Sequence, residues 1–205
     1  GFFQKDFTTL FDPETILAGF DYVQTPSESR WYTAVLNDEM VAKILNMQQE
    51  CQLSRVALVE MTLRKLTTPL ASAWATAWAK FYDKLQLTPE EILTYRQQFL
   101  DMVNGPIAPA SKMALSHLPK LWETKAIETS ELLAILAYAL QHNTQGIAQQ
   151  AFRLLKKIAT KEKKYFQDIL VHTVSALTTP HKAFRKELLQ WLTKLKPDQF
   201  SPELK

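Results

Sequence analysis

The feature that most constrains the fold of this 205-residue chain is an internal repeat of its apolar positions, with a period of 37 residues. One set of positions at that spacing holds Trp78, Leu115, Phe152 and Leu189, and a second set holds Phe81, Leu118, Leu155 and Leu192. A third set marks a turn between two apolar segments of each copy and consists of Pro69, Pro106, Asn143 and Pro180. About four such copies predict an all-α fold, a right-handed α-solenoid in which antiparallel helix pairs stack on one another.

The helical spacing of apolar residues between turn signals predicts helices at roughly 38–50, 54–67, 69–86, 89–104, 108–125, 129–142, 146–161, 164–178 and 181–195. Helix starts are marked by Thr-Pro pairs, the clearest being the capping-box sequence Thr88-Pro89-Glu90-Glu91. We expect a repeat domain over residues 51–205, with repeats at 54–86, 89–125, 129–161 and 164–195. Residues 1–50 fit the period only in part, and we interpret them as an irregular N-terminal cap or a degenerate repeat.

The second helix expected for the third repeat resembles the second helix of a HEAT repeat, since Ile147, Ala151, Phe152, Leu155 and Ile158 follow a helical spacing. More narrowly, residues from about 53 to 161 resemble an uncharacterised bacterial family of HEAT-like helical domains. The segments behind this resemblance are Leu53-Ser54-Arg55, Leu87-Thr88-Pro89-Glu90-Glu91, Ala110-Ser111-Lys112-Met113-Ala114-Leu115 and Gln149-Gln150-Ala151-Phe152-Arg153-Leu154-Leu155. The resemblance implies a HEAT/ARM-like fold and no activity, because no function is established for that family.

Composition argues against several classes of function. Only four glycines occur, so the chain has no glycine-rich phosphate loop, and its single cysteine, Cys51, cannot form an internal disulfide or a multi-cysteine zinc site. His117, His142, His172 and His181 lack the spacing of a metal-binding helix, and no acid pair or serine motif indicates catalysis. We therefore expect no enzyme, cofactor or metal. Because no run of about eighteen apolar residues occurs, we also expect no membrane segment. The single cysteine leads us to expect a reduced, cytoplasmic location.

Charge is distributed unevenly along the chain. Residues 1–50 hold three Lys or Arg against eight Asp or Glu, whereas residues 151–196 hold eleven against three. One position of the period in the second helices is charged throughout and holds Asp83, Lys120, Lys157 and Lys194. At about 100° per residue, Lys157 lies nearly opposite the apolar stripe of its helix, and we place three further cations on the same solvent side. The predicted partner-binding residues are Lys120, Arg153, Lys156, Lys157, Lys186 and Lys194; a basic face kept for solubility is the alternative.

Two classes of function fit this surface, and a third possibility is structural. The first is a non-catalytic protein-interaction scaffold whose protein partner is acidic where it makes contact. The second is a nucleic-acid-binding protein similar to the HEAT-like alkyl-purine DNA glycosylases, with Asp83, Trp74 and the lysines in a basic groove. The third is a spacer between other domains, because the chain begins without Met and Ser201-Pro202 resembles a helix start. These ends lead us to expect a fragment of a larger bacterial protein.

Overall fold

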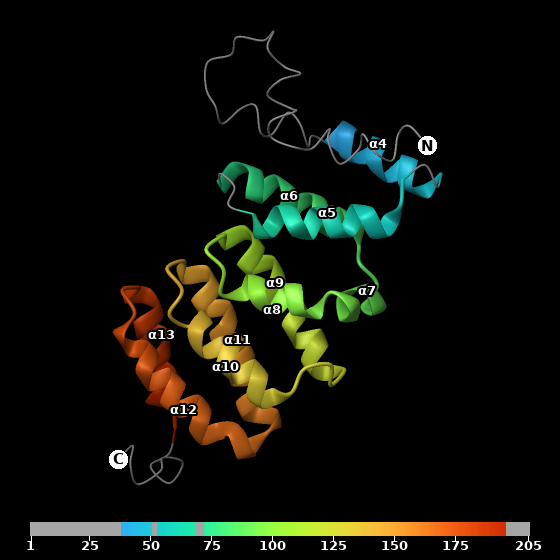
Figure 1. Ribbon diagram of the computed structural model, residues 1–205. Coiled ribbons are helices and arrows are strands. Elements are labelled where there is room, and N and C mark those ends of the chain that lie inside the picture. Colours follow the sequence, from blue (N-terminus) through green and yellow to red (C-terminus); the bar gives the residue numbers. More distant parts are fainter. Residues whose placement is uncertain (1–37, 51–52, 69–71, 196–205) are drawn as a thin grey trace, which may run out of the picture. The chain divides into compact units, whose positions relative to one another are not determined.

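The computed structural model of the protein describes residues 38–50, 53–68 and 72–195, and every regular element within them is a helix (Figure 1). These residues fall into two compact units, one ending at Thr88 and the other beginning at Pro89. The expectation of an all-α fold is therefore confirmed for the described part of the chain.

The first unit contains α4 (Asp38–Gln49), α5 (Arg55–Thr67) and α6 (Ser72–Leu85). α5 begins after Ser54, whose hydroxyl accepts a hydrogen bond from a backbone N–H of the first turn. α5 and α6 pack against each other. Arg55 Nη2 donates to the carbonyl oxygen of Leu85 at 2.9 Å, and this bond ties the start of α5 to the end of α6.

The second unit contains α7 (Pro89–Thr94), α8 (Arg96–Val103), α9 (Ala108–Glu123), α10 (Thr129–Ala139), α11 (Gln145–Lys161), α12 (Phe166–Ser175) and α13 (Lys182–Leu192), with 3-10 helices η1 (Lys163–Tyr165) and η2 (Ala176–Thr178) flanking α12. α8 packs on α9, and α10 packs on α11. We call α8, α10 and α12 the first helices, and they contact one another in chain order. The second helices, α9, α11 and α13, do the same. This order runs from green to red in Figure 1.

Two predicted helices differ in detail from the structure. The expected helix 89–104 is divided into α7 and α8 at Tyr95, whose backbone lies at φ −100° and ψ 18° and whose side chain is buried. The expected helix 164–178 has 3-10 turns at both ends. The other helix ends lie within about three residues of their predicted positions, which is the usual scatter at helix termini.

The two sets of repeated apolar positions are buried in α6, α9 and α11, whereas their members in α13, Leu189 and Leu192, are not. Trp78, Leu115 and Phe152 are 2%, 1% and 0% exposed, whereas the equivalent Leu189 is 50% exposed. Leu192, the last member of the second set, is only half-buried. The expectation that the fourth copy shares the continuous core is therefore wrong at Leu189.

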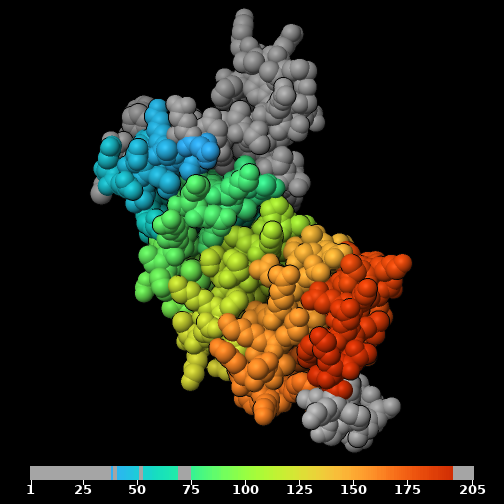
Figure 2. Space-filling view, turned by 180° about the vertical axis from the view of Figure 1, so that it is seen from behind, coloured from blue at the N-terminus to red at the C-terminus, as the bar shows by residue number. Residues whose placement is uncertain are grey.

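The cause of this difference is the neighbour that each helix has on its far side. The ring of Phe152 meets Phe184 and Trp191 of α13 edge to face, with centroids 5.9 and 5.6 Å away. In the described part of the chain the principal contacts of α13 are with α11 and η2. Figure 2 shows α13, in red, at the edge of the second unit beside α11 and α12. The face of α13 that corresponds to the Phe152 face of α11 therefore remains exposed.

Side-chain amides link successive first helices at positions one period apart. Asn104, just after α8, donates its amide N–H to the carbonyl oxygen of Ile135 in α10 at 3.3 Å. Gln141, which follows Asn104 by one repeat, donates in the same way to the carbonyl oxygen of Ser175 in α12 at 3.2 Å. Donors one period apart thus link successive first helices, although their acceptors are 40 residues apart and so do not occupy equivalent positions.

The end of α9 is formed without glycine. Lys125 adopts the left-handed backbone at φ 57°, and the N–H of Ala126 donates to the carbonyl oxygen of Leu121 at 2.8 Å. This pattern of a left-handed residue and a bond back across the last turn is the one that glycine usually supports. In a chain with only four glycines, such a helix end gives no clear sequence signal.

Several sequence predictions fall outside the described residues. They are residues 1–37 of the predicted N-terminal cap (1–50), Cys51, Pro69, the side chain of Trp74 and the helix start at Ser201-Pro202. Among the residues that the structure does describe, no helix has the length and apolarity needed to cross a membrane.

Candidate functional site

The six predicted partner-binding residues all lie on the second helices of the second unit or directly after them. Lys120 belongs to α9, Lys186 to α13, and Lys194 follows α13, while Arg153 and two lysines belong to α11. Four of the six are exposed and form no ion pair with any described residue, namely Lys120, Arg153, Lys186 and Lys194. The surface that these four cations form along the second helices is called the basic face below.

Lys157 does not add a free charge to the basic face, because it is paired with an acid of α9. Its Nζ donates to Glu123 Oε1 at 2.6 Å, and Lys161 Nζ lies 3.5 Å from the same oxygen. The hydrogen bond from Lys157 and the charges of both lysines lower the pKa of the Glu123 carboxyl below its ordinary value of 4.5. The group is exposed, so this pair links α9 to α11 with only a small effect on stability.

Lys156 lies at the edge of the apolar stripe of α11, not on the open solvent side that the sequence predicted. It is half-buried, and its Nζ sits 4.6 Å from the centroid of the Phe152 ring. The same ammonium lies 3.5 Å from Glu187 Oε1 of α13, whose other oxygen accepts from Gln149 Nε2 at 3.1 Å. The reason is helical geometry: residue 156 follows residue 152 by four positions, so the two side chains share a face.

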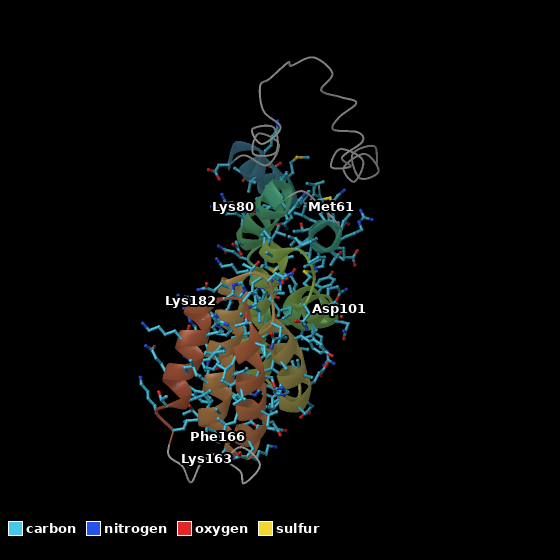
Figure 3. The ribbon with its side chains drawn as sticks, turned by 90° about the vertical axis from the view of Figure 1, so that its left-hand side faces the viewer. Met61, Lys80, Asp101, Lys163, Phe166 and Lys182 are labelled. Atoms are coloured by element: carbon cyan, nitrogen blue, oxygen red, sulfur yellow. The ribbon has the colours of Figure 1, made fainter. Side chains whose placement is uncertain are left out.

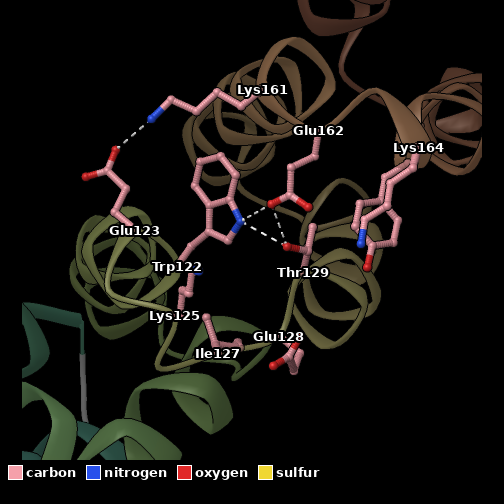
Figure 4. Close-up of a pocket in the computed structure, with 10 residues that line it drawn as sticks. Trp122, Glu123, Lys125, Ile127, Glu128, Thr129, Lys161, Glu162 and Lys164 are labelled. Atoms are coloured by element: carbon pink, nitrogen blue, oxygen red, sulfur yellow. Dashed lines mark hydrogen bonds and ion pairs between the residues drawn. The ribbon is translucent and has the colours of Figure 1, made fainter.

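An open hollow of about 870 Å³ lies at the C-terminal ends of α9 and α11 and is called the α9–α11 hollow below (Figure 4). The C-terminal ends of α9 and α11, the start of α10 and the turn into η1 form its wall. Its lining residues are Trp122, Glu123, Lys125, Ile127, Glu128, Thr129, Lys161, Glu162, Lys164 and Tyr165. Acidic and basic side chains therefore alternate around this hollow.

A closed polar network occupies the wall of the α9–α11 hollow. The buried indole N–H of Trp122 donates to Thr129 Oγ1 and to Glu162 Oε1, both at 3.0 Å, and the Thr129 hydroxyl donates to the same carboxylate oxygen at 2.8 Å. Lys161 Nζ lies 5.4 Å from the Trp122 ring. Figure 4 shows Trp122 and Thr129 converging on Glu162. In this hollow the Glu162 carboxylate therefore accepts hydrogen bonds from both Trp122 and Thr129.

Sequence reasoning missed this network. Trp122 and Thr129 are separated from Glu162 by about one repeat, and only the packing of α9, α10 and α11 brings them together. One sequence signal could have indicated it: Thr129 begins α10 and Glu162 follows the end of α11. In an antiparallel helix pair these two positions lie at the same end.

A second hollow of about 670 Å³, the α11–α13 hollow, lies at the corresponding place one repeat later. Shifted by 37 residues, Trp122, Glu123 and Thr129 correspond to Ala159, Thr160 and Phe166, all three of which line the second hollow. The remaining lining residues are Lys156, Lys163, Gln167, Trp191 and Leu195. Trp122 and Thr129, the two donors of the polar network, are thus replaced by Ala159 and Phe166.

The residues proposed for a nucleic-acid enzyme are divided between the two units. Asp83 is exposed on α6 in the first unit, while the lysines of the basic face belong to the second unit. His181 Nε2 and the carbonyl oxygen of His142 are 3.0 Å apart, which gives this histidine a bond to the backbone. In the described ranges no three His, Cys, Asp or Glu side chains are grouped as metal ligands would be.

A family model described as a domain of unknown function (DUF6493) matches residues 2–146. The match begins well before residue 53, where the predicted resemblance starts, and ends at the second residue of α11. Lys120 lies inside the matched range, while the other three cations of the basic face and the α11–α13 hollow follow it. No curated protein and no solved structure matches the chain.

Proposed function

The chain belongs to the DUF6493 family of domains of unknown function, and from that premise we propose that it is a non-catalytic protein-interaction module whose basic face binds an acidic protein segment. One observation underlies this proposal: four exposed cations follow the second helices with no described acid paired to them. An exposed field of one sign attracts a surface of the opposite sign and steers its approach.

We propose further that the second unit is part of a right-handed HEAT-like α-solenoid. Support comes from the chain-order contacts within the first helices and within the second helices, and from the similar amide bonds that Asn104 and Gln141 form with the next first helix. An experimental structure tests this through the rotation and rise from α8/α9 to α10/α11 and on to α12/α13. A constant operation supports the solenoid, and helices arranged around one centre contradict it.

An acidic protein fits the basic face better than a nucleic-acid backbone does. On the second helices Glu123 pairs with Lys157, and Glu187 pairs with Lys156. These two ion pairs carry no net charge, and they separate the unpaired cations of the basic face. A phosphate backbone is continuously charged, and its affinity comes from many simultaneous neutralised phosphates. A folded partner with a few well-placed carboxylates needs only a few cations.

A charge-reversed variant tests the proposal. We expect the whole chain to capture acidic proteins from lysate, and K120E/R153E/K186E/K194E to lower that binding by at least about tenfold because attraction becomes repulsion. The matched control is K43E/R64E/K80E/K84E, which makes the same charge change at exposed positions of the first unit. Equal binding by both variants contradicts the basic face as the site.

A gel shift with duplex DNA at low salt separates the two classes of ligand. The protein-interaction proposal expects no complex. A complex that weakens steeply as salt rises, and that the reversed variant abolishes, would support the nucleic-acid alternative instead. If neither ligand binds and deletion of residues 89–195 leaves all interactions of the full-length protein intact, a spacing role is the better account.

A further inference from the structure

The α11–α13 hollow differs from its counterpart one repeat earlier in a way that indicates a ligand. In the α9–α11 hollow, the Glu162 carboxylate accepts the hydrogen bonds that Trp122 and Thr129 donate. In the second hollow Ala159 and Phe166 stand at the positions of those two donors, and neither side chain can donate a hydrogen bond. The smaller side chain at 159 and the aromatic one at 166 leave an apolar recess.

Aromatic side chains give the recess a fixed wall. Trp191 packs edge to face on Phe152 at 5.6 Å between centroids and lies tilted against Phe166 at 6.3 Å. Both Trp191 and Phe166 remain half-exposed. The Trp191 indole N–H forms no hydrogen bond with another described residue, so this donor is available to an acceptor on a ligand.

Cations stand at the edge of the recess. Lys163 is exposed and forms no ion pair within the described chain, and Lys156 shares its charge with Glu187. Figure 3 places Lys163 and Phe166 together at one end of the second unit, and Lys182, at the start of α13, at the other end. Among the described residues that line this hollow none is acidic, whereas three acids line the α9–α11 hollow.

We propose that the α11–α13 hollow is a peptide-binding site that takes one apolar anchor, a Phe, Leu or Trp side chain, from an acidic segment whose carboxylates meet Lys163 and the basic face. The inference rests on the proposed function, and it adds the kind of segment that is recognised. Charge complementarity selects an acidic segment, and the apolar recess supplies the desolvated pocket in which a binding anchor contributes most. An apolar pocket with a few polar groups at its edge is the usual form of such a site.

The experiment is a selection of phage-displayed random peptides on the whole chain, followed by synthesis of a selected peptide with a fluorescein label. We expect the selected sequences to share one large apolar residue with Asp or Glu on both sides. K163E should weaken binding by at least about tenfold, and alanine at the peptide's apolar residue should do the same. K182E is the matched control, with the same charge change at the far end of α13, and should leave affinity within about twofold.

A second variant tests the recess independently of charge. A159F introduces a large side chain where the first hollow has Trp122, and we expect it to reduce peptide affinity while helicity by circular dichroism stays unchanged. Acidic peptides that bind K163E and A159F as well as the original chain would overturn the hollow but leave the proposed function standing, provided that K120E/R153E/K186E/K194E abolishes their binding. Selected peptides without acidic residues, or no selected peptides at all, would overturn both.

Discussion

The helices α11 and α13 hold equivalent positions of the same repeat, yet they differ in what their apolar residues contact. Phe152 of α11 is completely buried against α13, whereas Leu189, one period later, is half in water. The comparison teaches that the side chain at a repeat position determines which face of a helix is apolar, and the next helix determines whether that face is buried. Mutations at matched positions turn this difference into measurable free energies.

The largest contrast is expected between F152A and L189A. Removal of the Phe152 ring deletes a fully buried side chain and leaves a cavity against Phe184 and Trp191, at a cost of about 3–5 kcal/mol. Removal of the exposed Leu189 should cost less than about 1 kcal/mol. Urea unfolding followed by circular dichroism measures both. Similar losses for the two variants would mean that α13 is covered in solution.

A smaller contrast is expected between L155A and L192A. Leu155 is fully buried, and its loss should cost about 2–5 kcal/mol, while the half-buried Leu192 should cost about 1–2 kcal/mol. Native-state hydrogen exchange resolves where the loss falls, because local opening energies are read helix by helix. We expect L192A to increase exchange in α13 alone. If both variants increased hydrogen exchange throughout the second unit, α11 and α13 would not differ as an inner and a terminal helix.

The two tryptophans that line the hollows should also differ. W122F deletes a donor that bonds to Thr129 and Glu162, and we expect a loss of about 1–2 kcal/mol because a buried acceptor loses a partner. W191F removes no hydrogen bond to a described residue and should cost less than about 1 kcal/mol. Thermal melting of both variants makes the comparison. A larger loss for W191F would show that the second hollow has a polar network of its own.

The smallest effect is expected at the ion pair between α9 and α11. The pKa of Glu123 is lowered in the folded state, so the stabilisation is present above the ordinary value of 4.5 and disappears as pH falls through the lowered value. Unfolding measured against pH should therefore show E123Q slightly less stable than the original chain near neutral pH, with the gap closing in acid. A gap that stays constant with pH would assign the effect to something other than charge.

Most of the fold was predictable from the sequence. Apolar spacing located helices such as α5 and α11 to within a residue or two, because this signal is local. The exposure of Leu189 was not predictable, because burial at this position depends on a neighbour that lies beyond the repeat itself. The break at Tyr95 was missed because a buried aromatic residue continues the apolar pattern across it.

The candidate site was predictable only in part. Helical geometry put Arg153 and Lys194 on the solvent side, where the structure has them. It could not indicate that Glu123 pairs with Lys157, because that contact joins side chains from successive repeats. The hollows were missed for the same reason, since their walls come from several helix ends. Whether the basic face binds a partner stays a prediction.

The left-handed backbone at Lys125 has a consequence for engineering the chain. A non-glycine residue in that conformation costs on the order of 1 kcal/mol, so K125G should raise the melting temperature without touching any apolar contact. Lys125 also lines the α9–α11 hollow, and the substitution would delete a positive charge from its edge. The single exposed substitution K125G should therefore give a more thermostable protein, and it would remove one positive charge that the natural chain has at this hollow.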